Sequence, residues 1–171
     1  MIIRVATETD MPALEKIALA TLAVAYKGQI DIGNRLGGFA EQMHRREVII
    51  ACTDDASAFI LSERIAQDRW MVRFLMPLDM PAQTGRDLIA FALIAEHSVR
   101  PLKATDETFA QLNEQSQVER GTASSYQTIL GCQSRAVTDA QGVKRATEIY
   151  MPAAALAARL GVKLTFAAVR P

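Results

Sequence analysis

The residue types that most often carry catalysis or bind metal ions are sparse in this 171-residue sequence. The two cysteines, Cys52 and Cys132, lie far apart among apolar residues, so neither a redox pair nor a zinc knuckle is indicated. The two histidines, His44 and His97, have no metal-type partner three or four positions away. The sequence contains no serine-hydrolase elbow, no zinc-protease helix motif and no phosphate loop. It therefore predicts no metal site.

Composition and charge narrow the class of protein. Half of the residues are hydrophobic and 22% are charged, which is typical of a globular domain. Lys plus Arg equals Asp plus Glu at 19 each, and this balance disfavours nucleic-acid binding by charge. No segment reaches the roughly 18 apolar residues that span a bilayer, and no signal peptide opens the chain. We expect a cytoplasmic protein with no membrane partner.

The elements that must position any site form a mixed α/β pattern. Three strand-like segments with short links, between residues 47 and 76, predict an antiparallel meander. Residues 139–142, Asp-Ala-Gln-Gly, predict a hairpin turn. Residues 106–121 have helical composition. The expected strands are residues 2–6, 47–53, 57–63, 69–76, 99–104, 132–138, 143–151 and 162–169, and the expected helices are 10–28, 39–46, one beginning at Thr84, 122–130 and 152–160.

The helix that begins at Thr84 has a distinctive start. Residues 84–87, Thr-Gly-Arg-Asp, have the shape of a capping box, in which Thr84 and Asp87 satisfy the free amides of the first turn. A capping box needs no ligand to explain it. The amides of a helix N-terminus can also bind an anion, because they present free donors at the positive end of the helix dipole. Both interpretations remain open from the sequence.

Two segments of the chain resemble the GNAT family of acetyl-CoA-dependent N-acetyltransferases. Residues 3–14, IRVATETDMPAL, resemble a GNAT start in which a strand with the pattern R-x-A-T-x-x-D leads into the first helix. Residues 123–132, ASSYQTILGC, resemble the late GNAT helix A-x-x-L-Y-x-x-x-G-F, and a hairpin follows in both. The resemblance covers about residues 2–151. It implies a GNAT-like α/β (α+β) fold with a mixed, mostly antiparallel central sheet flanked by helices.

The resemblance also implies a binding loop for acetyl-CoA. GNAT enzymes hold the pyrophosphate on a loop of the type Q/R-x-x-G-x-G/A ahead of the third helix, and the matching segment here is residues 81–87. Ala82 and Asp87 depart from that pattern, at the Q/R position and at the second glycine. The residues that the resemblance assigns to the cofactor are Gln83, Thr84, Gly85 and Arg86.

Catalytic groups are implied at two places. Many GNAT enzymes protonate the departing CoA thiolate with a tyrosine four residues before the glycine that ends the late helix, but Gln127 has that place here. Tyr126, one position earlier, is the candidate acid and is alternatively a packed core residue. Glu63 is the candidate general base, with Asp68 beside it at the other end of the same hairpin link. Both carboxylates are alternatively solvated turn charges.

The resemblance implies a domain over residues 1–151 that transfers acetyl from acetyl-CoA to a small-molecule or protein amine. Residues 152–171 form a helix-strand extension that packs on this domain or on a partner, including a second copy of the chain. The alternative is a non-catalytic GNAT-fold protein that serves as a binding or assembly component. The ending of the chain is also similar to that of GNAT-like proteins of tailed phages, which would place it in the host cytoplasm or the virion.

Overall fold

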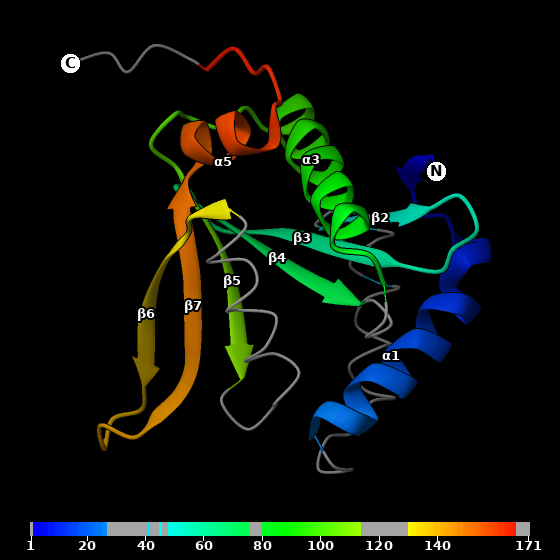
Figure 1. The fold of residues 1–171 in the computed structure, drawn as a ribbon, viewed down its shortest axis with the longest axis horizontal. Helices are drawn as coiled ribbons and strands as arrows, with labels where there is room; N and C mark the ends of the chain where they lie inside the picture. The colour runs from blue at the N-terminus through cyan, green and yellow to red at the C-terminus, as the bar shows by residue number, and fades with distance from the viewer. Residues whose placement is uncertain are drawn as a thin grey trace.

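A single seven-stranded sheet organises the molecule (Figure 1). The computed structural model describes residues 2–26, 41, 45, 48–75, 80–113 and 130–166. Strand order is β1-β2-β3-β4-β5-β7-β6, and every pairing is antiparallel except that of β4 with β5. The predicted mixed α/β fold with a mostly antiparallel sheet is confirmed. The elements are β1 Ile3–Val5, η1 Glu8–Asp10, α1 Met11–Tyr26, β2 Val48–Thr53, β3 Phe59–Ala66, β4 Arg69–Leu75, α3 Ala82–Val99, β5 Glu107–Asn113, β6 Gln133–Thr138, β7 Lys144–Pro152 and α5 Ala153–Leu160.

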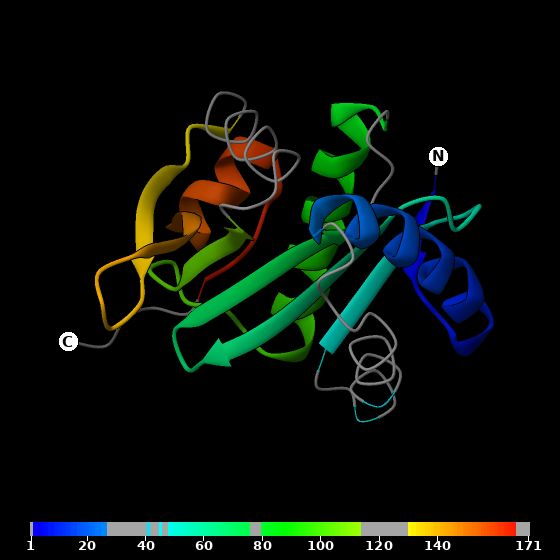
Figure 2. The same cartoon turned by 90° about the horizontal axis from the view of Figure 1, so that it is seen from below.

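Helices cover both faces of the sheet (Figures 1 and 2). On one face, Leu14 and Ala18 of α1 pack in a buried cluster with Phe59 and Leu61 of β3. On the other face, α3 and α5 lie side by side over a larger cluster that includes Trp70 of β4. Residues of one strand alternate between the two clusters because successive side chains point to opposite faces.

The segment that resembles a GNAT start forms one interlocked unit. The guanidinium of Arg4 donates two hydrogen bonds to the Asp10 carboxylate at 2.7 and 2.8 Å. The same carboxylate accepts the backbone N–H and the hydroxyl of Thr7 at 2.8 and 3.0 Å. The Arg4 guanidinium holds the pKa of Asp10 well below its usual range. These contacts tie β1 to the beginning of α1. Asp10 was expected to cap α1, and its carboxylate instead closes the η1 turn through Thr7.

Both predicted antiparallel connections are present. β2, β3 and β4 form the expected meander. In the β6–β7 hairpin, the N–H of Gly142 donates to Asp139 O at 3.0 Å, and the Asp139 carboxylate accepts the N–H groups of Gln141 and Val143. Gly142 has a φ of 79°, which favours glycine because other residues meet a steric penalty there.

Several sequence predictions are wrong. Residues 99–104 are not a strand, and the fifth strand instead lies at Glu107–Asn113, inside the segment expected to be helical. α3 begins at Ala82 rather than Thr84 and has no side-chain cap, so the predicted capping box does not form. Residues 162–166 belong to no strand. Apart from Glu41 and Arg45, the helix expected at 39–46 lies outside the described residues, as does the helix at 122–130 apart from Leu130.

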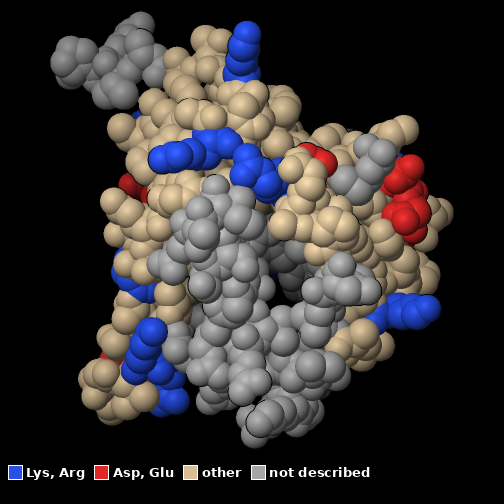
Figure 3. All heavy atoms as spheres, in the orientation of Figure 1, with Lys and Arg blue, Asp and Glu red and all other residues tan. Residues whose placement is uncertain are grey.

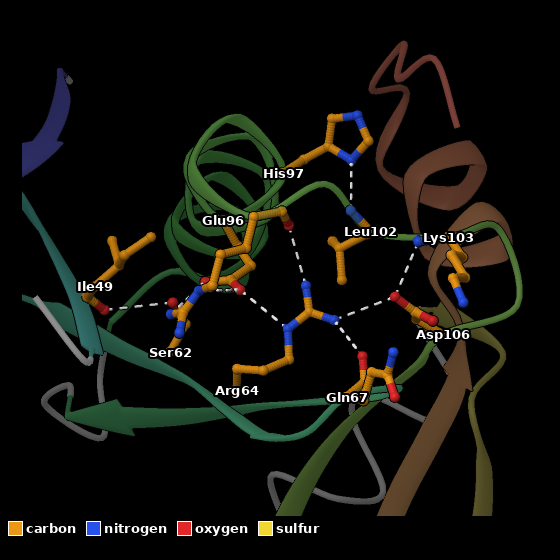
Figure 4. A network of polar contacts seen from close by, with 10 residues as sticks. Ile49, Ser62, Arg64, Gln67, Glu96, His97, Leu102, Lys103 and Asp106 are labelled. Carbon is orange, nitrogen blue, oxygen red and sulfur yellow. Dashed lines mark hydrogen bonds and ion pairs between the residues drawn. The ribbon is translucent and has the colours of Figure 1, made fainter. Parts of the chain in front are cut away.

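A buried ion network fixes the end of the sheet where β4 and β5 pair (Figure 4). Arg64 of β3 contacts Glu96 of α3 and Asp106, the residue before β5, each at 3.2 Å. The Glu96 side chain is fully buried, and Arg100 also pairs with it at 3.2 Å. Asp106 accepts the Lys103 N–H at 2.9 Å. The network therefore locks α3 and the start of β5 against the β3–β4 hairpin.

The part of the chain that the structure describes contains neither a membrane-spanning helix nor a metal-binding cluster. None of the described helices combines the length and the apolar character that a membrane crossing requires. In the same residues, no three His, Cys, Asp or Glu side chains gather closely enough to hold a metal ion.

Candidate functional site

The parallel pair β4 and β5 separates after a short stretch of pairing. Three residue pairs join the strands, from Arg69 with Glu107 to Met71 with Phe109. β4 then runs on to Leu75 and β5 to Asn113 without further pairing, and the two strands diverge (Figure 1). A parallel pair that opens in this way interrupts the sheet at its centre.

A pocket lies at this opening on the face covered by α3 and α5. The space between its lining atoms is about 350 Å³ and includes open solvent, so the pocket is shallow rather than enclosed. β4 and β5 supply one wall, α3 and α5 contribute one side chain each, and β7 closes the remaining side. The lining residues are Trp70, Val72, Ile89, Thr108, Phe109, Ala110, Leu130, Cys132, Ile149, Met151 and Leu156.

Three polar groups line this largely apolar pocket. The hydroxyl of Thr108 donates to Met151 O at 2.7 Å and is therefore already used as a donor. Burial raises the pKa of the Cys132 thiol, so this side chain stays protonated and packs as a small apolar group. Trp70 is fully buried, yet its indole N–H has no hydrogen-bond partner among the described residues. A buried indole N–H usually has a partner, which makes Trp70 the exception in this wall.

All four residues predicted to bind the cofactor lie in the first two turns of α3. Thr84 and Gly85 are buried, Gln83 is exposed and Arg86 is half-buried. The Gln83 amide donates to the Asp87 carboxylate at 2.7 Å along the helix surface. The first N–H groups of an α-helix have no intrahelical acceptor, and Pro81 immediately precedes α3. Asp87 thus places its charge beside Gln83, one turn beyond those amides.

Arg86 connects the beginning of α3 to the end of α5. Its guanidinium donates to Arg159 O at 3.0 Å, in the last turn of α5, where cations are favoured by the helix dipole. The exposed Arg159 side chain passes over Gly131, with Nη2 3.5 Å from the position of a β-carbon there. Figure 3 shows Lys and Arg side chains gathered over the region where α3 and α5 meet. This basic surface adjoins the pocket through Leu130, Cys132 and Leu156.

Glu63, the predicted general base, lies on the opposite face of the sheet. It pairs with Met71 on β4, which pairs in turn with Phe109 on β5, so the three residues form a row across the paired end of the opening. Glu63 is half-buried, and Val48 of β2 flanks it on the other side. The structure therefore places Glu63 near the opening but does not bring it to the pocket wall.

An ion network lies beside this row and joins β4, β5, β7 and β6. Arg69 and Arg135 each contact both Glu107 and Glu148, at distances from 2.6 to 3.2 Å. The guanidinium carbons of the two arginines also lie 4.1 and 4.4 Å from the ring centres of Phe109 and Tyr150. Arg135 is the main reason why the pKa of Glu107 is lowered.

Tyr126, the predicted acid, and Gln127 lie outside the described residues, so the structure does not test them.

The sequence did not predict the pocket, because residues from five separate parts of the chain form it. One local signal was available for β5. Residues 107–110, Glu-Thr-Phe-Ala, carry a β-branched and an aromatic residue together, which favours a strand over a helix.

The arrangement matches a known fold. A spermidine N-acetyltransferase from Vibrio cholerae, solved with CoA and spermine, superposes with a TM-score of 0.62 at 9% identity, covering 91% of this chain and 96% of that one. This chain has the GNAT fold. A second GNAT neighbour is FdhC, a nucleotide-linked sugar GNAT in its apo form, with a TM-score of 0.61 at 10% identity over 90% of this chain and 87% of its own.

A chimera of the Vibrio cholerae spermidine enzyme and hSSAT gives a TM-score of 0.63 at 10% identity, covering 91% of this chain and 99% of the chimera. No family model matches the sequence, and no curated protein matches it. The GNAT resemblance predicted from the two sequence segments is therefore confirmed for the fold. The suspected phage origin stays a prediction.

Proposed function

We propose that this GNAT-fold chain binds an acyl-coenzyme A and transfers the acyl group to an amine. The observation that carries the proposal is the apolar pocket at the opening between β4 and β5, directly beside α3 and the basic surface at its N-terminal end. This combination suits a ligand with an apolar reactive end and an anionic far end.

The anionic end of such a ligand fits the first turns of α3. Gln83 would contribute its backbone amide, since helix N-termini bind phosphate groups through free N–H donors, whereas the Thr84 N–H already donates to Pro81 O at 2.9 Å. Arg86 and Arg159 would add charge, because guanidinium groups form strong hydrogen bonds with phosphate oxygens. The Asp87 carboxylate accepts a hydrogen bond from the Gln83 amide on the same side of the helix.

The transfer would take place at the paired end of the opening. The amine nitrogen forms a bond to the acyl carbon, the carbon–sulfur bond breaks, and the CoA thiolate takes up a proton while the amine loses one. We assign proton removal to Glu63, which lies one strand away from the opening on the α1 side of the sheet, and proton donation to Tyr126. An amine acceptor agrees with the spermine bound to the Vibrio cholerae neighbour.

Thermal unfolding with and without acetyl-CoA tests the binding step. A ligand at 100 times its dissociation constant should stabilise the folded state by about 2.7 kcal/mol. Arg159→Ala should weaken this effect, because it removes an exposed cation beside α3. Arg145→Ala is the matched control, since its exposed guanidinium pairs with Asp139 at 2.7 Å in the distant β6–β7 hairpin. The absence of any shift at millimolar acetyl-CoA would contradict the proposal.

A second candidate is a non-catalytic GNAT-fold protein that acts as a binding or assembly component. It is favoured by the pocket lining, in which Cys132 is the one ionisable side chain among the described residues and is held protonated. The exposed parts of residues 152–171 would then contact the partner, which includes a second copy of the chain. Binding of acetyl-CoA without acetylation of spermine, lysine peptides or amino sugars, together with a dimer mass in solution, would favour this candidate.

A further inference from the structure

His97, in the last turn of α3, is the one histidine among the described residues, and the proposed function does not use it. Its half-buried ring lies between Leu102, which follows α3, and residues 162–166, which follow α5 (Figure 4). Residues 162–166 are called the C-terminal strap below. We propose that His97 is a pH-sensitive latch, which holds the C-terminal strap on α3 when its ring is neutral and releases it when the ring is protonated. This inference does not depend on the proposed function.

The C-terminal strap alternates between half-buried and exposed side chains but belongs to no strand. The half-buried members, which pack against the core cluster beneath α3 and α5, are Val162, Leu164 and Phe166. Among the described residues, the part of the strap from 163 to 166 has a single hydrogen bond, between the His97 ring and Thr165 O. The strap is therefore held by apolar packing and by one polar contact, which His97 provides.

Two hydrogen bonds determine where the His97 ring carries its proton. The backbone N–H of Leu102 donates to Nδ1 at 3.1 Å, so Nδ1 is unprotonated. Nε2 lies 3.2 Å from Thr165 O, which can only accept, so Nε2 carries the proton and donates the hydrogen bond. The ring also meets Phe166 edge-on, with 5.7 Å between the ring centres. The docked strap therefore requires a neutral ring with its proton on Nε2.

Protonation of Nδ1 is incompatible with this arrangement. An imidazolium donates at both nitrogens, so its Nδ1–H would meet the Leu102 N–H with no acceptor between them. The ring must turn to separate the two donors, and Nε2 then leaves Thr165 O because both nitrogens belong to one rigid ring. Histidine is the side chain whose charge ordinarily changes between about pH 5 and 8. The strap is therefore docked at the upper end of this range and released toward the lower end.

The charged groups around His97 offer an imidazolium no new partner. Those on the elements packed around it are Arg64 of β3, Glu96 and Arg100 of α3, Lys103 and Asp106 of the link to β5, and Lys163 of the strap. Both carboxylates already pair with Arg64. The contacts of His97 with described residues include no ion pair. Protonation therefore breaks one hydrogen bond without adding a salt bridge, and the α3 dipole favours the charged ring once it has turned.

Trypsin cleavage after Lys163, an exposed strap residue, measures the released fraction in the full chain. The rate is divided at each pH by the rate for a free peptide of residues 161–171, which removes the pH dependence of the protease. We expect this relative rate to rise by about 2- to 10-fold from about pH 8 to about pH 5, as expected for the loss of one hydrogen bond. Cleavage after Arg64, whose side chain is 12% exposed, should stay absent and so exclude acid unfolding. A constant relative rate, or cleavage at both sites together, would overturn the latch.

The two histidines of the chain supply a matched pair of variants. In His97→Gln the side-chain amide can donate to Thr165 O but does not titrate, so the relative rate should be constant with pH. His44→Gln should keep the rise of the wild type. A rise in His97→Gln equal to that of the wild type would overturn the assignment to His97, as would its loss in His44→Gln. If His97→Gln fails to fold by circular dichroism, the ring 15N shifts of the wild type replace it. They should place the proton on Nε2 at about pH 8, and a proton on Nδ1 there would overturn the latch.

Discussion

The two faces of strands β4, β5 and β7 differ sharply although the same short segments form both. On the α1 side, Arg69, Glu107 and Glu148 belong to a network in which each charge has at least two partners. On the α3 side, Trp70 and its neighbours line an apolar pocket, and the buried indole N–H of Trp70 lacks an acceptor among the described residues. Alternation along the strand separates these environments by a single residue step.

This difference indicates which face is prepared for a ligand. A polar network whose members are all paired gains little from an added molecule, because new contacts must replace existing ones. A buried donor without an acceptor costs free energy in the isolated protein, and a suitable acceptor recovers it on binding. The α3 face thus has the properties of a binding site, and the α1 face, apart from Glu63, has those of a scaffold.

The largest expected loss of unfolding free energy comes from breaking the buried ion network of Arg64, Glu96 and Asp106, which holds α3 against the sheet. Arg64→Met leaves Asp106 and Glu96 without their shared cation, and Glu96 is fully buried. Removing one partner of a buried ion pair costs about 3–5 kcal/mol of unfolding free energy. Urea denaturation measures this loss, with Arg145→Met on the exposed hairpin as the control, for which we expect less than about 1 kcal/mol. A loss below 1 kcal/mol for Arg64→Met would show that the network does not hold α3.

A smaller loss of unfolding free energy is expected for a substitution on the α1 side of the sheet. Glu148→Gln weakens the contacts of a nearly buried carboxylate with Arg69 and Arg135, which are about one-third exposed. Hydrogen bonds to charged groups contribute about 1.5–3 kcal/mol, so we expect a loss within that range. Affinity for acetyl-CoA should stay unchanged, because Glu148 does not line the pocket. A clear loss of affinity in isothermal titration would break the separation between the two faces.

The same network predicts a pH dependence. Arg135 lowers the pKa of Glu107 below its ordinary value of 4.5, so the folded protein releases this proton more readily than the unfolded chain. The resulting stability is present above pH 4.5 and is lost as the pH falls through the lower, folded-state pKa. The stability difference between the wild type and Glu107→Gln should therefore shrink in urea titrations below pH 4.5. A difference that is constant with pH would exclude this linkage.

The smallest effect on stability is expected at Trp70. Trp70→Phe loses ring area but also removes the unpartnered donor, whose burial costs about 1–3 kcal/mol. The two contributions oppose each other, and we expect a net change within about 1 kcal/mol in the absence of ligand. Thermal and urea unfolding measure it. A loss above about 3 kcal/mol, as in ordinary core truncations, would indicate that the indole N–H does have a partner.

The sequence predicted the parts of the fold that local patterns determine. The meander from β2 to β4, the β6–β7 hairpin with Gly142 and the helix that ends at Gly161 all follow from alternation, turn residues and glycine placement. The Arg4–Thr7–Asp10 unit was visible as a motif, although its hydrogen bonds were not.

The predictions from the sequence were wrong for the elements whose position depends on long-range contacts, namely β5 and the beginning of α3. β5 pairs parallel with β4 and antiparallel with β7 and has buried residues on both faces, so it lacks the simple alternation of a surface strand. The polar residues after it favoured a helix. The capping box at Thr84 fails because α3 gains a further turn before it, with Thr84 N–H bonded to Pro81 O. The pocket arises where β4 and β5 part, and no single segment encodes that geometry.

A crystal structure of the protein grown with acetyl-CoA tests the central claim most directly. We expect density for the acyl end beside Trp70, between β4 and β5, and density for the phosphates at the first turn of α3 near Arg86 and Arg159. Acetyl-CoA bound elsewhere on the molecule, or a pocket filled by the protein's own side chains at saturating acetyl-CoA, would contradict the account.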